Sequence, residues 1–301
     1  MLRILFKATV KRELSTIFLF LMKEGIVMIE LPEARVIAEQ INQTIKGKKI
    51  SSVVADHTPH KFAWYFGDPK EYHNLLFDKT IGEAKSFGGL VEISAENCRI
   101  LLGEGVRIIF HNKNEKLPAK HQLLIMFDDG SSVSSSIQMY GGMWCFKEGE
   151  NHNPYYEIAK EKPSPYSDDF DEDYFMSLLK ENTGNLSAKT FLATQQRVPG
   201  LGNGVLQDIL WNAKLHPKSK ISSLSHNNLL DIYKSIKATL NEMAEKGGRD
   251  TEKDFFGING GYKTMMSSKN ATMSCPRCGG TVIKETYMGG SIYYCSGCQQ
   301  F

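Results

Sequence analysis

The sequence lacks any apolar run near the roughly 18 residues that a membrane-spanning helix needs, and its longest early run covers only residues 16–22. It also lacks a strong charge of either sign, because 36 Lys and Arg stand against 34 Asp and Glu in 301 residues. The net charge of +2 excludes a polycation that holds nucleic acid or membranes by bulk charge alone. Internal repeats and low-complexity tracts are absent as well. With 41% apolar residues, the chain is expected to form one large or two modest globular domains.

The first 27 residues stand apart from the rest of the chain. Basic residues precede the apolar run, as in a secretory signal peptide, but Lys23-Glu24-Gly25 follows it instead of a small-residue cleavage site. This tripeptide can be encoded by a bacterial ribosome-binding sequence, and only two residues separate it from Met28. We therefore hypothesise that translation starts at Met28 and that residues 1–27 are a mis-annotated extension. A genuine amphipathic N-terminal helix is the alternative.

The segment from Met28 to about residue 150 contains one helical pattern and many strand patterns. Apolar residues between Ala34 and Ile45 have the spacing of an amphipathic helix, which begins at Pro32 and ends before Gly47. After this helix, alternating segments separated by glycine-rich turns predict strands. These segments are residues 50–54, 90–95, 99–102, 106–111, 122–127 and 131–137. They predict an antiparallel sandwich or barrel.

The second half of the chain is predicted to be helical. Three prolines mark residues 148–169 as a connector, and helical patterns follow at residues 188–195, 204–212 and 227–246. Between Ser187 and Thr264 stand eleven Lys or Arg and seven Asp or Glu, so the basic excess is concentrated here. The sequence thus predicts an α+β fold whose first half is rich in strands and whose second half is helical.

Four of the six cysteines form two C-x-x-C pairs near the C-terminus, separated by sixteen residues. Each pair can present two thiolates from a tight turn, and two such turns complete a tetrahedral site. The spacing predicts one structural Zn²⁺ held by Cys275, Cys278, Cys295 and Cys298. Two disulfides are the alternative, which the lack of a secretory signal disfavours. The other two, Cys98 and Cys145, are expected to be buried free thiols.

A glycine-rich break over residues 198–204 joins two of the predicted helices. The helix after it should begin near Asn203, where unpaired backbone N–H groups attract a phosphate. Together with nearby basic residues such as Lys189, this pattern suggests a clamp on a DNA backbone. A plain turn of a helical hairpin is the alternative.

Three separated segments resemble one family. The opening at residues 28–33 resembles the M-P-E-L-P-E start of the formamidopyrimidine-DNA glycosylase and endonuclease VIII (Fpg/Nei) family. Residues 198–204, with Leu215-His216-Pro217 downstream, resemble its helix–two-turns–helix (H2TH) element, and residues 293–299 are similar to its terminal zinc finger. Gly247-Gly248-Arg249-Asp250 also falls where the family has a comparable segment.

The resemblance covers residues 28–301 in the family's order and implies its fold. That fold has an N-terminal helix plus an antiparallel β-sandwich, a helical H2TH domain and a C-terminal zinc-ribbon hairpin. The boundaries we expect are 28–150 for the β-sandwich catalytic domain, 151–268 for the linker and H2TH DNA-binding domain, and 269–301 for the zinc finger. DNA is expected in the cleft between the first two.

The resemblance also implies a chemistry. Family members excise damaged, mostly oxidised bases and then cut the strand, using an N-terminal amine that forms a Schiff base with the deoxyribose. The matching positions are Ile29 for the amine, Glu30 for proton transfer on the sugar and Glu33 for support of the N-terminus. The implied DNA-binding residues are Lys189, Gly202 and Asn203 at phosphates, and Met139 and Tyr140 in the space left by the extruded base.

Some of these residues have plainer interpretations. Asn203 can be a helix cap, Lys189 a solvated charge, and Met139 and Tyr140 can simply pack in the sandwich. The family pattern is also broken at three positions. Ile29 replaces a proline, and Phe87 and Gly290 correspond to the active-site lysine and the phosphate-binding arginine, within a residue or two.

The expected function is therefore a DNA glycosylase and AP lyase of base-excision repair, acting on double-stranded DNA with a damaged base or an abasic site. A catalytically impaired protein that only binds damaged DNA is the alternative, supported by the three departures. A partner made of structured RNA is a third and weaker possibility. We expect a monomer in the bacterial cytoplasm, associated with the nucleoid and not with a membrane.

Overall fold

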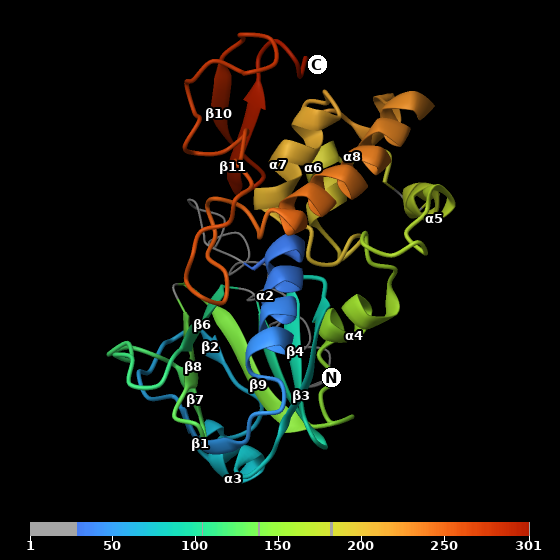
Figure 1. The fold of residues 1–301 in the computed structure, drawn as a ribbon. Helices are drawn as coiled ribbons and strands as arrows, with labels where there is room; N and C mark the ends of the chain where they lie inside the picture. Colours follow the sequence, from blue (N-terminus) through green and yellow to red (C-terminus); the bar gives the residue numbers. More distant parts are fainter. Residues whose placement is uncertain (1–28, 104, 138, 181–182, 301) are drawn as a thin grey trace.

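The structure is a computed structural model that describes residues 29–103, 105–137, 139–180 and 183–300 (Figure 1). The hypothesis about residues 1–27 lies outside these described residues. Helix α2 (Leu31–Thr44) lies between a half built from sheets and a half built mainly from helices. Its side chains enter both, because Ile37 joins the core of the first half and Leu31 that of the second. The helix predicted from Pro32 is thus confirmed.

Two sheets enclose the core of the first half. Its elements are β1 (Ile50–Ala55), β2 (Ala63–Trp64), η1 (Pro69–Glu71), α3 (Tyr72–Leu76), β3 (Ile81–Phe87), β4 (Leu90–Ala95), β5 (Cys98–Gly103), β6 (Val106–His111), β7 (Leu123–Phe127), β8 (Ser132–Ile137) and β9 (Gly141–Lys147). The strand orders are β2-β9-β5-β4-β3 and β1-β7-β8-β6. All neighbours are antiparallel except β2 and β9. The predicted antiparallel sandwich is confirmed.

Three strands of the sandwich were not predicted, namely β2, β3 and β9. Strand β9 is buried on both faces over six of its seven residues, so its sequence does not alternate between apolar and polar. Strand β2 has only two residues. Strand β3 contains Gly82, Glu83 and Lys85, which weaken its apolar pattern. The two free cysteines, Cys98 and Cys145, are buried in β5 and β9 as expected.

The second half is built around three helices. Its elements are α4 (Pro154–Glu161), α5 (Glu172–Ser177), η2 (Leu178–Lys180), α6 (Ala188–Ala193), α7 (Asn203–Asn212), η3 (Ile221–Ser223), α8 (His226–Glu245), β10 (Val282–Tyr287) and β11 (Gly290–Cys295). Apolar residues of α6, α7 and α8 form the second core. The β10–β11 hairpin lies beside α7 at the C-terminal end of the chain (Figure 1).

The segment that follows α8 returns to the sandwich before the chain reaches the hairpin. Phe255 is fully buried in the core of the first half, and its carbonyl accepts a hydrogen bond from Phe110 N at 2.8 Å. Its own N–H donates to Gln40 Oε1 of α2 at 2.9 Å. These contacts tie the two halves together at a second place besides α2. Among the described residues, no helix has both the length and the apolar character needed to cross a membrane.

Candidate active site

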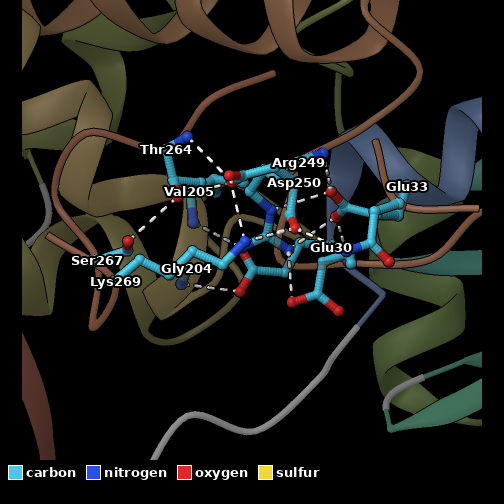
Figure 2. A network of polar contacts seen from close by, with 11 residues as sticks. Glu30, Glu33, Gly204, Val205, Arg249, Asp250, Thr264, Ser267 and Lys269 are labelled. Atoms are coloured by element: carbon cyan, nitrogen blue, oxygen red, sulfur yellow. Dashed lines mark hydrogen bonds and ion pairs between the residues drawn. The ribbon is translucent and has the colours of Figure 1, made fainter. Parts of the chain in front are cut away.

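Glu30 stands at the junction of the two halves. It directly precedes α2, and its side chain points to the N-terminus of α7 (Figure 2). One carboxylate oxygen accepts the backbone N–H of Gly204 at 2.9 Å, and the other accepts that of Val205 at 2.8 Å. These N–H groups have no partner inside the helix, and the positive end of the helix dipole favours a carboxylate there. Glu30 is only 5% exposed, so helix α7 fixes its position closely.

Arg249 lies at the centre of a buried ion cluster. Its guanidinium binds both carboxylate oxygens of Glu33, with Nε–Oε1 at 2.9 Å and Nη2–Oε2 at 2.8 Å. The same group lies 3.7 Å from a Glu30 oxygen and 4.0 Å from a Glu252 oxygen. Figure 2 shows the contacts of Arg249 with Glu30 and Glu33, and beside them Asp250, which binds Thr264 and Lys269. Three carboxyl groups therefore share one cation in a site shielded from water.

This burial changes the proton affinity of the carboxyl groups. Burial raises the pKa of Glu30 above its ordinary value; Arg249 and the amides of α7 oppose the rise, while the charge of Glu33 adds to it. For Glu252, burial raises the pKa to about 8 against the opposing charge of Arg249. Burial in this cluster therefore favours the protonated form of these carboxyl groups, a property that acid–base chemistry uses.

A turn of the sandwich covers the backbone that precedes Glu30. A Cβ atom at Gly89 would lie 2.8 Å from the carbonyl oxygen of Ile29, so only glycine fits there without a shift. Next to it, Gly200 accepts a hydrogen bond from Leu31 N at 3.1 Å. Phe87 instead belongs to an aromatic cluster with Tyr156, at a ring distance of 6.1 Å. Gly89 of this turn therefore lies against the Ile29 carbonyl.

The residues predicted at DNA phosphates contact the C-terminal hairpin. Lys189 is 2% exposed, and its ammonium donates to the carbonyl of Tyr287 at 2.7 Å. Burial lowers its pKa to about 8. Asn203 donates to the carbonyl of Ser291 at 3.0 Å, and Gly202 is the N-cap of α7. Lys189 is thus no solvated charge, and Asn203 is the first residue of the helix instead of its cap.

Met139 and Tyr140 precede β9 and are both half-buried. The ring of Tyr140 lies 5.6 Å from that of Trp64. Strands β2 and β9 lie towards the opposite edge of the five-stranded sheet from β3, whose hairpin turn contains Gly89. The register pairs Leu90 with Gly103 and Gly103 with Gly142, so these two residues lie at the same end of the sheet as Gly89, with β5 between β9 and β4.

The four C-terminal cysteines come together as predicted. Their sulfur atoms all lie within 4.8 Å of one another. Backbone N–H groups approach two of the sulfurs: Gly280 donates to Cys278, and Gly297 and Cys298 donate to Cys295, each at 3.4 Å. Such donors stabilise thiolates, and four thiolates at these distances fit the tetrahedral coordination of a structural Zn²⁺.

Comparison with known proteins gives the chain a family. A model of the formamidopyrimidine-DNA glycosylase H2TH domain matches residues 162–254. Formamidopyrimidine-DNA glycosylase of Bacillus licheniformis is 28% identical over 282 residues, which cover 91% of this chain and all of that protein. The protein of the same name from Lactococcus lactis subsp. cremoris is 28% identical over 286 residues, again over 91% of this chain and its whole length. The chain is a member of the formamidopyrimidine-DNA glycosylase (Fpg) family.

Solved Fpg structures agree with the fold. Lactococcus lactis Fpg in complex with an abasic site containing DNA superposes with a TM-score of 0.77 at 24% identity, covering 90% of this chain and all of that one. The wild-type Lactococcus lactis Fpg in complex with an oxidized pyrimidine containing DNA superposes with a TM-score of 0.76 at 25% identity, with the same coverage of both chains. The predicted α+β fold, with its N-terminal helix, helical H2TH region and C-terminal hairpin, is therefore confirmed for this Fpg-family chain.

The sequence did not reveal the roles of Arg249 and Glu252. Arg249 follows two glycines in a segment that resembles the family, which was the available signal. Its partner Glu33 lies 216 residues earlier in the chain, so no local pattern could connect them.

Proposed function

We propose that this Fpg-family chain is a DNA glycosylase with AP lyase activity on double-stranded DNA that contains an oxidised base or an abasic site. The observation that carries the proposal is the position of Glu30, directly after Ile29 and fixed by the first turn of α7. In this proposal residues 28–150 supply the chemistry, residues 151–268 hold the DNA and residues 269–301 form the zinc finger. Its relatives are bacterial, so we expect it on bacterial DNA in the cytoplasm.

The proposed reaction uses the N-terminal amine. If translation starts at Met28 and this residue is removed, Ile29 carries a primary amine beside Glu30. An α-amino group has a pKa near 7.7–8.0, which leaves a neutral, nucleophilic fraction at physiological pH. Its nitrogen attacks C1′ of the deoxyribose, the bond from C1′ to the base breaks, and the base leaves with the bonding electron pair and a proton. The C1′–O4′ bond then breaks, O4′ takes a proton, and the C1′–nitrogen bond becomes the double bond of the Schiff base from which the strand is cut.

Glu30 and its neighbours have the properties that this reaction needs. Glu30 moves protons on the sugar, and its raised pKa lets it carry a proton at a pH where an ordinary glutamate is ionised. Glu33, through Arg249, supports the same backbone, since its carboxylate also accepts Glu30 N at 3.3 Å. We further propose that Lys189, Gly202 and Asn203 face the DNA phosphates together with the hairpin they bind, and that Met139 and Tyr140 face the opened base stack.

An excision assay tests this function. The protein expressed from Met28 is mixed with duplexes that each contain one oxidised base, and the release of the base is measured. Glu30→Gln keeps the size of the side chain but removes the proton donor, so excision should fall by about 100-fold or more. Glu39→Gln, on the exposed face of α2, is the control and should leave the rate unchanged. Equal rates for Glu30→Gln and the unmodified protein would refute the proposed role.

A second function is favoured by two substitutions. Phe87 and Gly290 stand where the family resemblance places a lysine and an arginine, so neither position supplies a cation to a phosphate. A protein that recognises damaged DNA without cutting it would tolerate both. Tight, salt-dependent binding to a damaged duplex with no excision of any base tested would support this alternative. Equal binding to structured RNA would count against both functions.

A further inference from the structure

Trp211 connects helix α7 to the cysteine cluster. It stands at the C-terminal end of the helix whose first turn binds Glu30. Its side chain is 8% exposed and packs with Cys275 and Cys295 in a small third core, together with Met266, Val282 and Tyr293. An aromatic residue from outside the hairpin therefore forms part of the wall around the sulfur atoms.

Arg277 holds this tryptophan in place. It lies between the two cysteines of the first C-x-x-C pair, and its guanidinium carbon is 3.9 Å from the centre of the Trp211 ring. Its Nη1 donates to the carbonyl of Trp211 at 2.7 Å, and its Nη2 donates to Asn212 Oδ1 at 3.0 Å. A planar guanidinium that stacks on the ring and binds the backbone below it leaves the indole little freedom to turn.

The indole N–H of Trp211 is buried and has no hydrogen-bond partner in the part of the chain that the structure describes. The side chain packs with Cys275, so the sulfur of this cysteine is the acceptor that the surroundings offer. A buried donor needs a partner, and a thiolate is a charged acceptor that binds a donor more strongly than a neutral one does.

We propose that Trp211 is a positioning residue of the metal site, which donates its indole N–H to the Cys275 thiolate and slows the loss of Zn²⁺. The inference rests on the proposed structural zinc. Four thiolates around Zn²⁺ carry a net charge of −2, so donors and cations beside the sulfurs stabilise the bound state. Backbone N–H groups of the hairpin donate hydrogen bonds to the sulfurs of Cys278 and Cys295. Trp211 supplies a donor from α7, and Arg277 adds a positive charge nearby.

Metal release tests the inference without any DNA substrate. The chain expressed from Met28 in the presence of zinc is mixed with an excess of a coloured chelator, and the rate of zinc transfer is recorded. Trp211→Phe keeps an aromatic ring but removes the N–H donor. We expect Zn²⁺ release to be about tenfold faster, within the range of effects seen when a hydrogen-bond partner of a metal ligand is removed. Arg277→Met keeps the donor but frees the indole, and we expect a change in the same direction. Trp144→Phe, an equally buried tryptophan in the sandwich, is the matched control.

The outcomes separate this inference from the zinc assignment. Protein that neither retains nor takes up Zn²⁺ would overturn both. Zinc-loaded Trp211→Phe that releases metal at the rate of the unmodified protein would overturn the inference alone. Fluorescence gives an independent measurement, because the chain has three tryptophans and a Trp64→Phe, Trp144→Phe double variant leaves only Trp211. Removal of zinc should change its emission, and unchanged emission would contradict contact between the indole and a metal-bound sulfur.

Discussion

Replacing Arg249 with methionine should destabilise the protein strongly, because this residue is the cation shared by three buried carboxyl groups. It is 3% exposed and binds Glu33 through two side-chain hydrogen bonds of 2.9 and 2.8 Å. The variant leaves Glu33 buried without a cation, and breaking a buried ion pair in this way costs about 3–5 kcal/mol. Since domains of this kind have about 5–15 kcal/mol of stability, the variant should still fold.

The size of this loss should depend on pH. Burial already raises the pKa values of Glu30 and Glu252, and removing Arg249 takes away the charge that opposes this rise. The carboxyl groups can then become neutral at moderate acidity, which relieves the repulsion among them. We therefore expect the loss in unfolding free energy to be larger at pH 8 than at pH 5.5.

Urea unfolding followed by tryptophan fluorescence measures this effect at both pH values. Lys85→Met is the control, because Lys85 and Glu83 form an exposed pair, and its cost should stay below about 1 kcal/mol. In the double variant Arg249→Met, Glu33→Met the loss should be smaller than the sum of the two single losses, since the pair is removed as a unit. A loss below about 1 kcal/mol for Arg249→Met at pH 8 would refute the reasoning.

Three further predictions follow from single contacts. Burial raises the pKa of Glu252 to about 8 in the folded protein. Because this carboxyl group ionises more readily in the unfolded chain, the unfolding free energy should fall as pH rises from about 5 to 8. Glu252→Gln should flatten this decline, which urea titrations at several pH values measure. Lys189→Met removes the hydrogen bond to the Tyr287 carbonyl and the charge proposed to face a phosphate. A fluorescence titration should show equally weaker binding to damaged and undamaged duplexes. An effect on damaged DNA alone would count against the phosphate role of Lys189. Gly89→Ala should lower stability by about 1–3 kcal/mol because its Cβ meets the Ile29 carbonyl, and calorimetry that finds no loss would show that the turn can shift.

Features encoded in short stretches of sequence were predicted well. The spacing of the two C-x-x-C pairs indicated that the four sulfurs meet, and the structure confirms it. The 3.6-residue period of α2 and the alternation of β4 to β8 also gave the correct elements. In each case neighbours in the chain determine the structure, so the sequence alone carries the information.

Features that depend on distant residues could not be predicted. The burial of Lys189 arises from the hairpin almost a hundred residues later, so its charge resembled that of an ordinary surface lysine. Arg249 meets Glu33 only because the segment after α8 folds back to the first helix. Strand β9 is covered on both faces, and this removes the alternation that identifies a half-exposed strand.

The most direct test of the proposed chemistry is borohydride trapping. The chain expressed from Met28 is mixed with a duplex that contains one abasic site, borohydride is added, and the intact mass of the product is measured. The account predicts a covalent adduct on the N-terminal residue, which is Ile29, or Met28 where methionine is retained. Folded, zinc-containing protein that binds the duplex but gives no adduct would contradict the amine mechanism and favour a protein that only binds damaged DNA.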